Sequence, residues 1–403
     1  MARTCGNGAL RSLKIELDGS PVLLTSLRPY IYTGGIDHFL WFPTPGVQTL
    51  NLLPQKIDVS FLAGLLNSKG GIHNISIQVY PKYNHFWNLN ANLFVFLDDN
   101  VQGGGILVNT LPTVISTKAN GTVSDSLNFT NNNQNYEGKV ETLQDLKYNV
   151  SGLLIFSDGR KVTYSSEFSI YFHNIHFLNS SGSDYCYNVV NQSSSFTQNT
   201  TSTTVFPNGS NEKIQSVLYW DFFLSSNTTT LAVANAEDTY NKFADVLQIY
   251  RTNFTFFPVD YELNYFSDIS NLIHSKDVLQ YILKNDSFTP IKNFDTHSIQ
   301  NYSFIDNTEN CYFGEVTSIN NALNNTVYGS NCPGNSNSLD WWVDPYYGFP
   351  PLEIFYPPQK RNPPTKKTGS NDSPLKTVYH SSEKNVDGQR RWKRLYQLKK
   401  IKK

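Results

Sequence analysis

One carboxylate, Asp37, lies where it could act on a polar substrate. It follows Gly34 and Gly35 and precedes Trp41 in the segment YIYTGGIDHFLWFPTPGVQTLN, residues 30–51. Glycines let a ligand approach the backbone closely, a tryptophan face can stack on a sugar ring, and a positioned carboxylate can serve as a general base. The alternative is an aromatic-lined turn between two strands, because aspartate is also a common turn former.

Two further residues extend this candidate site. Asp58 lies in the strand-like stretch KIDVS, and Trp87 offers a second aromatic platform. A solvated strand face and core packing are the alternatives for these two side chains. The chain has no G-x-S-x-G motif that would indicate a nucleophilic serine, and no cysteine or histidine spacing indicates a metal site. We therefore expect neither a metal nor a cofactor.

The elements that must position these residues are β-strands. Leu13, Ile15 and Leu17 alternate with polar residues, and Asp18-Gly19 then supplies a hairpin turn. Residues 162–172 alternate in the same way, and the apolar run 93–97 predicts a strand buried on both faces. Residues 269–282 are the one stretch that indicates an amphipathic helix. The regular spacing of short strands predicts an all-β protein made of antiparallel sandwiches.

Composition divides the chain into three regions. We expect a β-sandwich region at 1–172, a second β-rich region at 173–357, and a basic disordered tail at 358–403. The Ser/Thr/Asn-rich stretch 174–211 is typical of a long loop or a domain junction. The tail holds fourteen of the 32 Lys and Arg and three of the 33 Asp and Glu, a net charge of +11 against −12 elsewhere. A charge run alone is a weak signal, so we expect no nucleic-acid partner.

Glycosylation motifs and cysteines favour the secretory pathway, with the protein secreted or held in a vacuole or lysosome. Cys311 and Cys332 bracket an Asn/Gly-rich loop that a disulfide could close, while Cys5 and Cys186 could form another. The chain opens with no apolar signal segment, and no apolar run reaches the roughly 18 residues that a membrane helix needs. The N-x-[ST] motifs begin at Asn74, Asn120, Asn128, Asn149, Asn179, Asn191, Asn199, Asn208, Asn227, Asn253, Asn285, Asn301, Asn324 and Asn371.

An ordered series of motifs over residues 7–100 resembles the A-type peptide N-glycosidases of plants and fungi. The series runs LKIELDG, YTGGI, Leu40-Trp41-Phe42-Pro43, KIDVSFLAGLLNSKGG and ANLFVFLDD. The resemblance implies jelly-roll-like sandwiches. It also implies a preceding N-terminal β domain in the parent protein, because the pattern begins in mid-course. Phe42 stands where the family usually has arginine.

The resemblance implies a glycoamidase that removes an N-linked glycan whole from an asparagine side chain. Asp37 and Asp58 would then be catalytic, and Gly34, Gly35, Trp41 and Trp87 would bind N-linked glycopeptides or glycans. The open alternative is a non-catalytic extracellular carbohydrate-binding or adhesion module that keeps the fold without the chemistry. Hydrolysis of glycopeptide separates the two.

Overall fold

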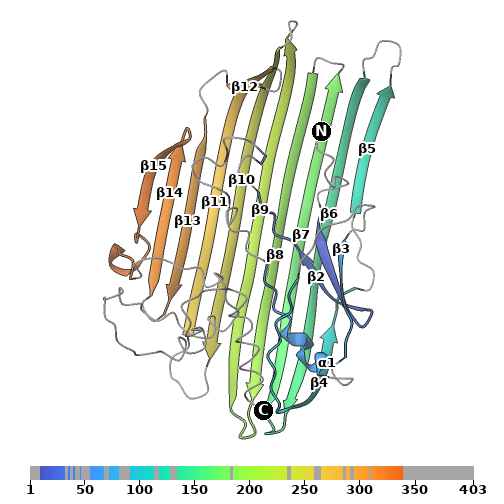
Figure 1. Cartoon of the computed structure of the whole chain (residues 1–403), viewed down its shortest axis with the longest axis vertical. Coiled ribbons are helices and arrows are strands. Elements are labelled where there is room, and N and C mark those ends of the chain that lie inside the picture. The colour runs from blue at the N-terminus through green and yellow to red at the C-terminus, as the bar shows by residue number, and fades with distance from the viewer. Residues whose placement is uncertain are drawn as a thin grey trace, which may run out of the picture. The chain divides into compact units, whose positions relative to one another are not determined.

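A computed structural model describes the fold of the chain. It covers residues 10–31, 35–36, 40, 46, 55–67, 72–80, 91–112, 118–127, 134–181, 185–233, 237–257, 265–284, 287–290, 295–307 and 310–338. Within these ranges the chain is almost entirely antiparallel β-structure, which confirms the all-β class (Figure 1). Two sheets contain all the strands described.

The smaller sheet has three strands, in the order β2-β1-β3. Its strands are β1 (Ser12–Leu17), β2 (Ser20–Ser26) and β3 (Ile75–Tyr80). Asp18 and Gly19 join β1 to β2 with φ angles of 52° and 81°, which is the left-handed geometry of a two-residue hairpin turn. The predicted hairpin is confirmed. Asp18 also accepts a hydrogen bond from Asn74 N (2.9 Å), so the turn is fastened to the start of β3.

The larger sheet has twelve strands, and neighbouring strands follow the order of the chain. β6 to β11 are each 20 residues or longer. The order is an up-and-down meander, so the Greek-key connections of a jelly roll are not seen among the described strands. The strands are β4 (Val101–Asn109), β5 (Lys118–Leu127), β6 (Gln134–Phe156), β7 (Lys161–Ser181), β8 (Tyr185–Val205), β9 (Asn211–Val233), β10 (Glu237–Phe257), β11 (Tyr265–Lys284), β12 (Ser287–Pro290), β13 (His297–Asp306), β14 (Cys311–Ile319) and β15 (Ala322–Tyr328).

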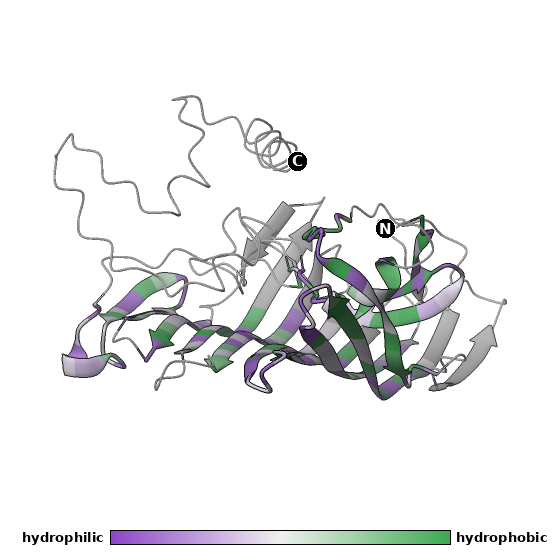
Figure 2. Cartoon of the chain, turned by 90° about the horizontal axis from the view of Figure 1, so that it is seen from below, coloured by the Kyte–Doolittle hydropathy of each residue, from purple (hydrophilic) through white to green (hydrophobic). Residues whose placement is uncertain are grey.

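The larger sheet has one buried face and one open face. Along β6 to β10 the even-numbered residues share one face and the odd-numbered residues the other, because successive side chains of a strand alternate. Every buried residue described in β7 to β10 is even-numbered. We call this the core face and its opposite the outer face. The alternation appears as bands of hydrophobic and hydrophilic colour along the strands in Figure 2.

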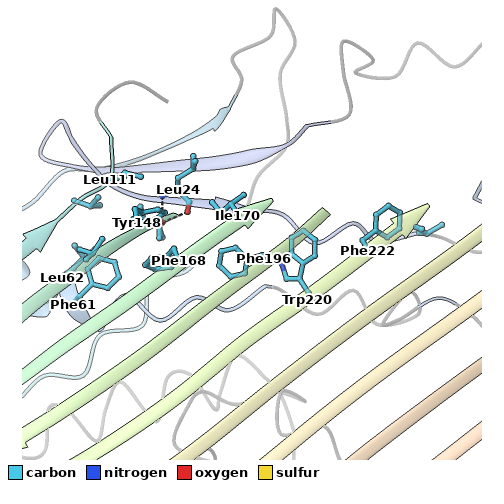
Figure 3. Close-up of a cluster of buried hydrophobic side chains, with 14 of the residues drawn as sticks. Leu24, Phe61, Leu62, Leu111, Tyr148, Phe168, Ile170, Phe196, Trp220 and Phe222 are labelled. Carbon is cyan, nitrogen blue, oxygen red and sulfur yellow. Dashed lines mark hydrogen bonds between the residues drawn. The ribbon is translucent and has the colours of Figure 1, made fainter. Parts of the chain in front are cut away.

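The core lies between the small sheet and the core face of β6 to β10. Stacked and tilted rings form a row across these strands (Figure 3): Tyr148 and Phe168 are 4.7 Å apart, and Phe196 and Trp220 are 6.3 Å apart. The Tyr148 hydroxyl donates to Leu24 O (2.5 Å) and accepts from Leu24 N (3.1 Å), which joins β6 to β2. Burial raises the pKa of this hydroxyl.

A short helical segment rests on glycines of the larger sheet. It consists of η1 (Ser60–Leu62) and α1 (Ala63–Leu66). A Cβ added to Gly152 would lie 1.9 Å from Phe61 O, and one added to Gly64 would lie 2.1 Å from Leu153 O. Only glycine allows the backbones to approach this closely. The FLAGLL motif is therefore a helical turn packed on β6.

Two secondary-structure predictions were wrong. Residues 93–97 are not in a strand and their side chains are exposed, with Leu97 74% accessible. Residues 269–282 lie in strand β11 and not in a helix. Ile269, Ile273 and Leu279 lie on the core face, while Leu272 and Val278 lie on the outer face. Apolar residues on both faces of a strand can imitate helical spacing.

The predicted division near residue 173 is not seen. β7 runs through this position and pairs along its whole length with β6 and β8. The stretch 174–211 is not a loop, because it contains the end of β7 and all of β8, and its Ser and Thr residues suit exposed strand positions. Residues 1–360 form one compact unit and residues 361–403 a second. The predicted disorder of the tail lies outside the described residues.

The last strands are closed by a disulfide. Cys311 at the start of β14 bonds to Cys332, beyond β15, with a Cα–Cα distance of 5.6 Å, in agreement with the sequence prediction. Both cysteines are buried with Phe313, and the short helix η3 (Pro333–Asn335) follows. None of the helices in the described part of the chain has the length and apolarity to cross a membrane.

Candidate functional site

The segment that leaves β2 runs along β10 on the core face of the larger sheet. Three contacts follow its course. The Arg28 guanidinium lies 4.5 Å from the centre of the Tyr250 ring. Gln248 Nε2 donates to Pro29 O (3.1 Å), and the Lys242 ammonium donates to Ile36 O. As the residue number rises along the segment, the residue number of its partner on β10 falls. The segment therefore runs antiparallel to β10.

The two ends of the loop 27–56 are joined at a neck. Gln55 Oε1 accepts from Arg28 N (2.9 Å), and Gln55 Nε2 donates to Ser26 O (2.9 Å). The Arg28 guanidinium also donates to the Tyr30 hydroxyl (2.6 Å) and stacks on its ring. These bonds fix the base of the loop, and the Lys242 bond holds Ile36 further along.

The far end of this segment has an unusual backbone. Gly35 is buried, and Ile36 adopts φ +66°. Positive φ is rare for a β-branched residue because Cβ then approaches the following carbonyl. Such a conformation costs about 1–3 kcal/mol and persists where surrounding contacts enforce it. Here the Lys242 bond to Ile36 O supplies one such contact.

The core face around Lys242 carries buried polar groups. Asp277 lies directly opposite Ala244 in the β10–β11 pair, which places it diagonally across from Lys242 at a Cα distance of about 7–8 Å. Asp277 is fully buried and accepts a hydrogen bond from Thr296 Oγ1 (2.6 Å). Ser275 is buried one position further along this face. A cation, a carboxylate and two hydroxyls thus gather near the end of the Gly-Gly segment.

Asp58 lies elsewhere on the core face. Its main-chain N and O form hydrogen bonds with Gln198 on β8, at 3.3 and 2.6 Å. Gln198 aligns through β9 with Thr252 on β10, ten residues beyond Lys242. Ten strand residues span about 33 Å. The structure therefore does not bring Asp58 to the Gly35–Ile36 end of the loop.

The Asp58 carboxylate has a local structural role. Its Oδ1 accepts from Ser60 N (2.8 Å), which fixes the turn that begins η1. Burial raises the pKa of Tyr164, and the nearby Asp58 charge adds to the rise. Asp58 itself is exposed.

Four of the residues predicted for the site, Asp37, Gly34, Trp41 and Trp87, lie outside the described residues. Gly35 lies at the loop end that Lys242 anchors. In the described ranges no group of three His, Cys, Asp or Glu side chains could hold a metal ion.

Sequence reasoning missed Lys242 and Asp277. A signal for Asp277 was present. It shares the parity of Ile273 and Leu279, which are buried on β11, so an acidic residue occupies an otherwise core-facing position. The helical interpretation of 269–282 hid this parity. The sequence holds no comparable signal for Lys242, because its role depends on which residue of β10 contacts Ile36.

The fold and these contacts define a class of protein: a two-sheet antiparallel β-protein in which Gln55 joins the ends of an N-terminal loop and Lys242 of the larger sheet holds Ile36. Residues 1–111 match the family model of peptide N-acetyl-beta-D-glucosaminyl asparaginase amidase A. This part of the chain is thus similar to that family, in agreement with the resemblance that the sequence motifs indicated. The matched range contains the small sheet, the loop, the helical segment and β4.

A curated relative extends the similarity into the larger sheet. The peptide-N4-(N-acetyl-beta-glucosaminyl)asparagine amidase A of Prunus dulcis is 28% identical over 252 residues, which are 59% of this chain and 40% of that protein. The chain thus spans about two fifths of the length of this relative. No solved structure matches the chain.

Proposed function

We propose that this chain is a glycoamidase that hydrolyses the bond between an N-linked glycan and an asparagine side chain. The observation that carries the proposal is the closed loop of the family-matched region, which Gln55 fixes at its neck and Lys242 holds at its far end. Catalytic groups have to be held in a defined geometry by such supports. The substrates would be N-linked glycopeptides, as the family description implies.

The proposed reaction adds water across the side-chain amide. A water oxygen attacks the amide carbon, a carboxylate accepts the water proton, and the carbon–nitrogen bond breaks. The protonated carboxyl group passes that proton to the glycosylamine nitrogen as it leaves, and aspartate stays on the peptide. A positioned base contributes about 10²–10⁴-fold to such a step, and an oxyanion donor about 10²–10³-fold.

In this proposal Asp37 is the base and Lys242 is a positioning residue. Asp37 follows Ile36, whose carbonyl Lys242 holds. Asp277, which lies diagonally across from Lys242 and accepts a hydrogen bond from Thr296, is a further candidate carboxylate. Asp58 is left out, since its contacts place it about 33 Å away along the strands and give it a turn-forming role.

The test is glycopeptide digestion in water enriched in heavy oxygen, followed by mass spectrometry. Wild-type protein is expected to convert the glycosylated asparagine into labelled aspartate, and Asp37→Ala is expected to abolish the label. Asp58→Asn, which keeps a carbonyl oxygen for the η1 turn, is expected to retain activity. Intact glycopeptide with the wild-type chain would contradict the proposal. Retention of the glycopeptide on the immobilised protein would then favour the binding module, consistent with Phe42 in the place of arginine.

Lys242 supplies a second prediction for this site. Lys242→Met keeps the aliphatic stem but removes the bond to Ile36 O, so the loop end loses its anchor. We expect hydrolysis to fall by about 10²-fold, the scale of a misplaced catalytic group, while the folded fraction stays unchanged. Lys276→Met, on the outer face of β11, is the matched control and is expected to keep full activity. Equal activity in both variants would remove Lys242 from the site.

A further inference from the structure

The N-x-[ST] motifs in the long strands occupy one face of the larger sheet. In β6 to β10 their asparagines are all odd-numbered, and in β13 the motif asparagine pairs with Leu272 on the outer face of β11. Each therefore lies on the outer face, and the set is Asn149, Asn179, Asn191, Asn199, Asn227, Asn253 and Asn301.

Asparagines on the core face behave differently. Asn174, Asn188 and Asn271 lie on that face, and the residues two positions on are His176, Val190 and Ile273, so none begins a motif. Hydroxyl residues are not scarce there, since Ser166, Ser194 and Thr200 are all buried on the core face. The separation therefore does not follow from a shortage of Ser and Thr on the core face.

The outer face is accessible where these motifs lie. None of the odd-numbered residues described in β6 to β10 is buried. Asn149, Asn191 and Asn199 are exposed, and so is Asn208 in the turn between β8 and β9. Side chains stand nearly perpendicular to a sheet, so an Nδ2 atom in the middle of a strand points away from the backbone and has room for a sugar.

Three of the asparagines form a transverse row. Asn149 on β6 pairs with Glu167, which pairs with Asn199 on β8, and Val217 on β9 connects Asn199 to Asn253 on β10. The row places a motif on every second strand. Strands lie about 4.8 Å apart, so neighbouring motifs are separated by about 10 Å.

We propose that the outer face of the larger sheet is an N-glycosylated surface, with Asn149, Asn191 and Asn199 as its principal sites. The reaction requires a lipid-linked oligosaccharide diphosphate and the transferase of the secretory pathway. A bond forms between asparagine Nδ2 and the first sugar carbon, the bond from that carbon to the diphosphate breaks, and Nδ2 loses one proton. The glycans would cover exposed apolar side chains on this face, such as Phe223 (39% accessible) and Val278 (49%), which would otherwise favour association.

The first test is site mapping. The full chain is secreted from a eukaryotic host, and glycan occupancy is measured by enzymatic deglycosylation in heavy-oxygen water and peptide mass spectrometry. Occupied Asn149, Asn191 and Asn199 are the expected result. Empty strand sites beside an occupied Asn208 in its turn would overturn the proposal. So would a chain that carries no glycan at all.

Two matched variants on β7 test whether the face matters. Thr163→Asn creates a motif with Ser165 on the outer face, and His176→Thr creates one at Asn174, which is 6% accessible on the core face. We expect the first variant to be secreted with one additional glycan and an unchanged thermal midpoint. In the second variant, the chains that carry a glycan at Asn174 should fail to fold and should not be secreted.

Adding Asn174→Gln to His176→Thr removes the motif and should restore secretion, which separates the glycan from the substitution itself. If chains glycosylated at Asn174 were secreted as efficiently as chains of Thr163→Asn glycosylated at the new motif, the two faces would be equivalent and the proposal would fail. Failure of the double variant to be secreted would also count against it.

Discussion

Tyr148 joins the two sheets at the scale of single atoms. Its hydroxyl forms hydrogen bonds with the main-chain N and O of Leu24 on β2, which is an edge strand of the smaller sheet. Leu24 is fully buried, so no solvent could replace this partner. Tyr148 therefore pairs main-chain polar groups of an edge strand inside the core, where an unpaired peptide group costs free energy.

Removing this hydroxyl should destabilise the protein. In Tyr148→Phe the Leu24 N and O lose their partner inside the core, which costs about 1–3 kcal/mol. Urea unfolding of the folded chain measures the loss. Tyr171→Phe, on the outer face of β7, is the control and should change the free energy of unfolding by less than about 0.5 kcal/mol. Equal losses in the free energy of unfolding of the two variants would mean that the two hydrogen bonds to Leu24 contribute nothing specific.

At the scale of elements, close backbone approach positions the helical segment that follows the loop. Phe61 O would lie 1.9 Å from a Cβ at Gly152, and Leu153 O would lie 2.1 Å from one at Gly64. Along the chain, this helical segment lies between Gln55, at the loop neck, and β3. Its contact with β6 thus fixes the chain on the return side of the loop.

Gly152→Ala tests this contact. The new methyl group would overlap Phe61 O, so η1 has to move away from β6, and overpacking of this kind costs about 1–3 kcal/mol. Gly103→Ala on β4 is the matched control, because nothing lies within 4 Å of its added Cβ. Thermal unfolding of both variants should show a lower midpoint only for Gly152→Ala. A lowered midpoint in the control alone would contradict the close approach.

The secondary-structure elements also show which predictions from the sequence were correct. The alternation at 162–172 and the Asp18-Gly19 turn each depend on residues a few positions apart, and both were correct. The run 93–97 was misjudged because apolar composition does not reveal whether a partner strand exists. Lys242 could not be found at all, since its contact with Ile36 joins residues 206 positions apart. Long-range placement was the information that the sequence lacked.

At the scale of the whole molecule, one compact unit contains every strand described. It ends at residue 360, and the basic region follows as a separate unit. The core between the sheets draws on β2 and on strands as distant as β11, through Ile273. We therefore expect residues 1–360 to unfold in a single cooperative transition.

Deletion of residues 361–403 tests this independence. Because that unit is separate, the shortened chain should keep the thermal midpoint and the hydrolytic activity of the full chain. Deletion from residue 310 onward is the contrasting variant, since it removes β14, β15 and the disulfide. Its midpoint should fall, because β13 loses the strand that pairs with its outer edge. A lower midpoint after the shorter deletion would show that the basic region supports the fold.

The chain-order meander also determines how the protein is assembled during synthesis. Each long strand can pair with the one made just before it, so the larger sheet can grow as the ribosome releases it. β1 and β2 precede the larger sheet in the chain, whereas their core partners Phe196 and Trp220 lie in β8 and β9. Until those strands are made, Leu23 and Leu24 lack part of their core, although earlier residues such as Tyr148 already belong to it. The β1–β2 hairpin therefore stays incompletely covered until β9 is made, and slower translation of the segment up to β9 would lengthen this interval.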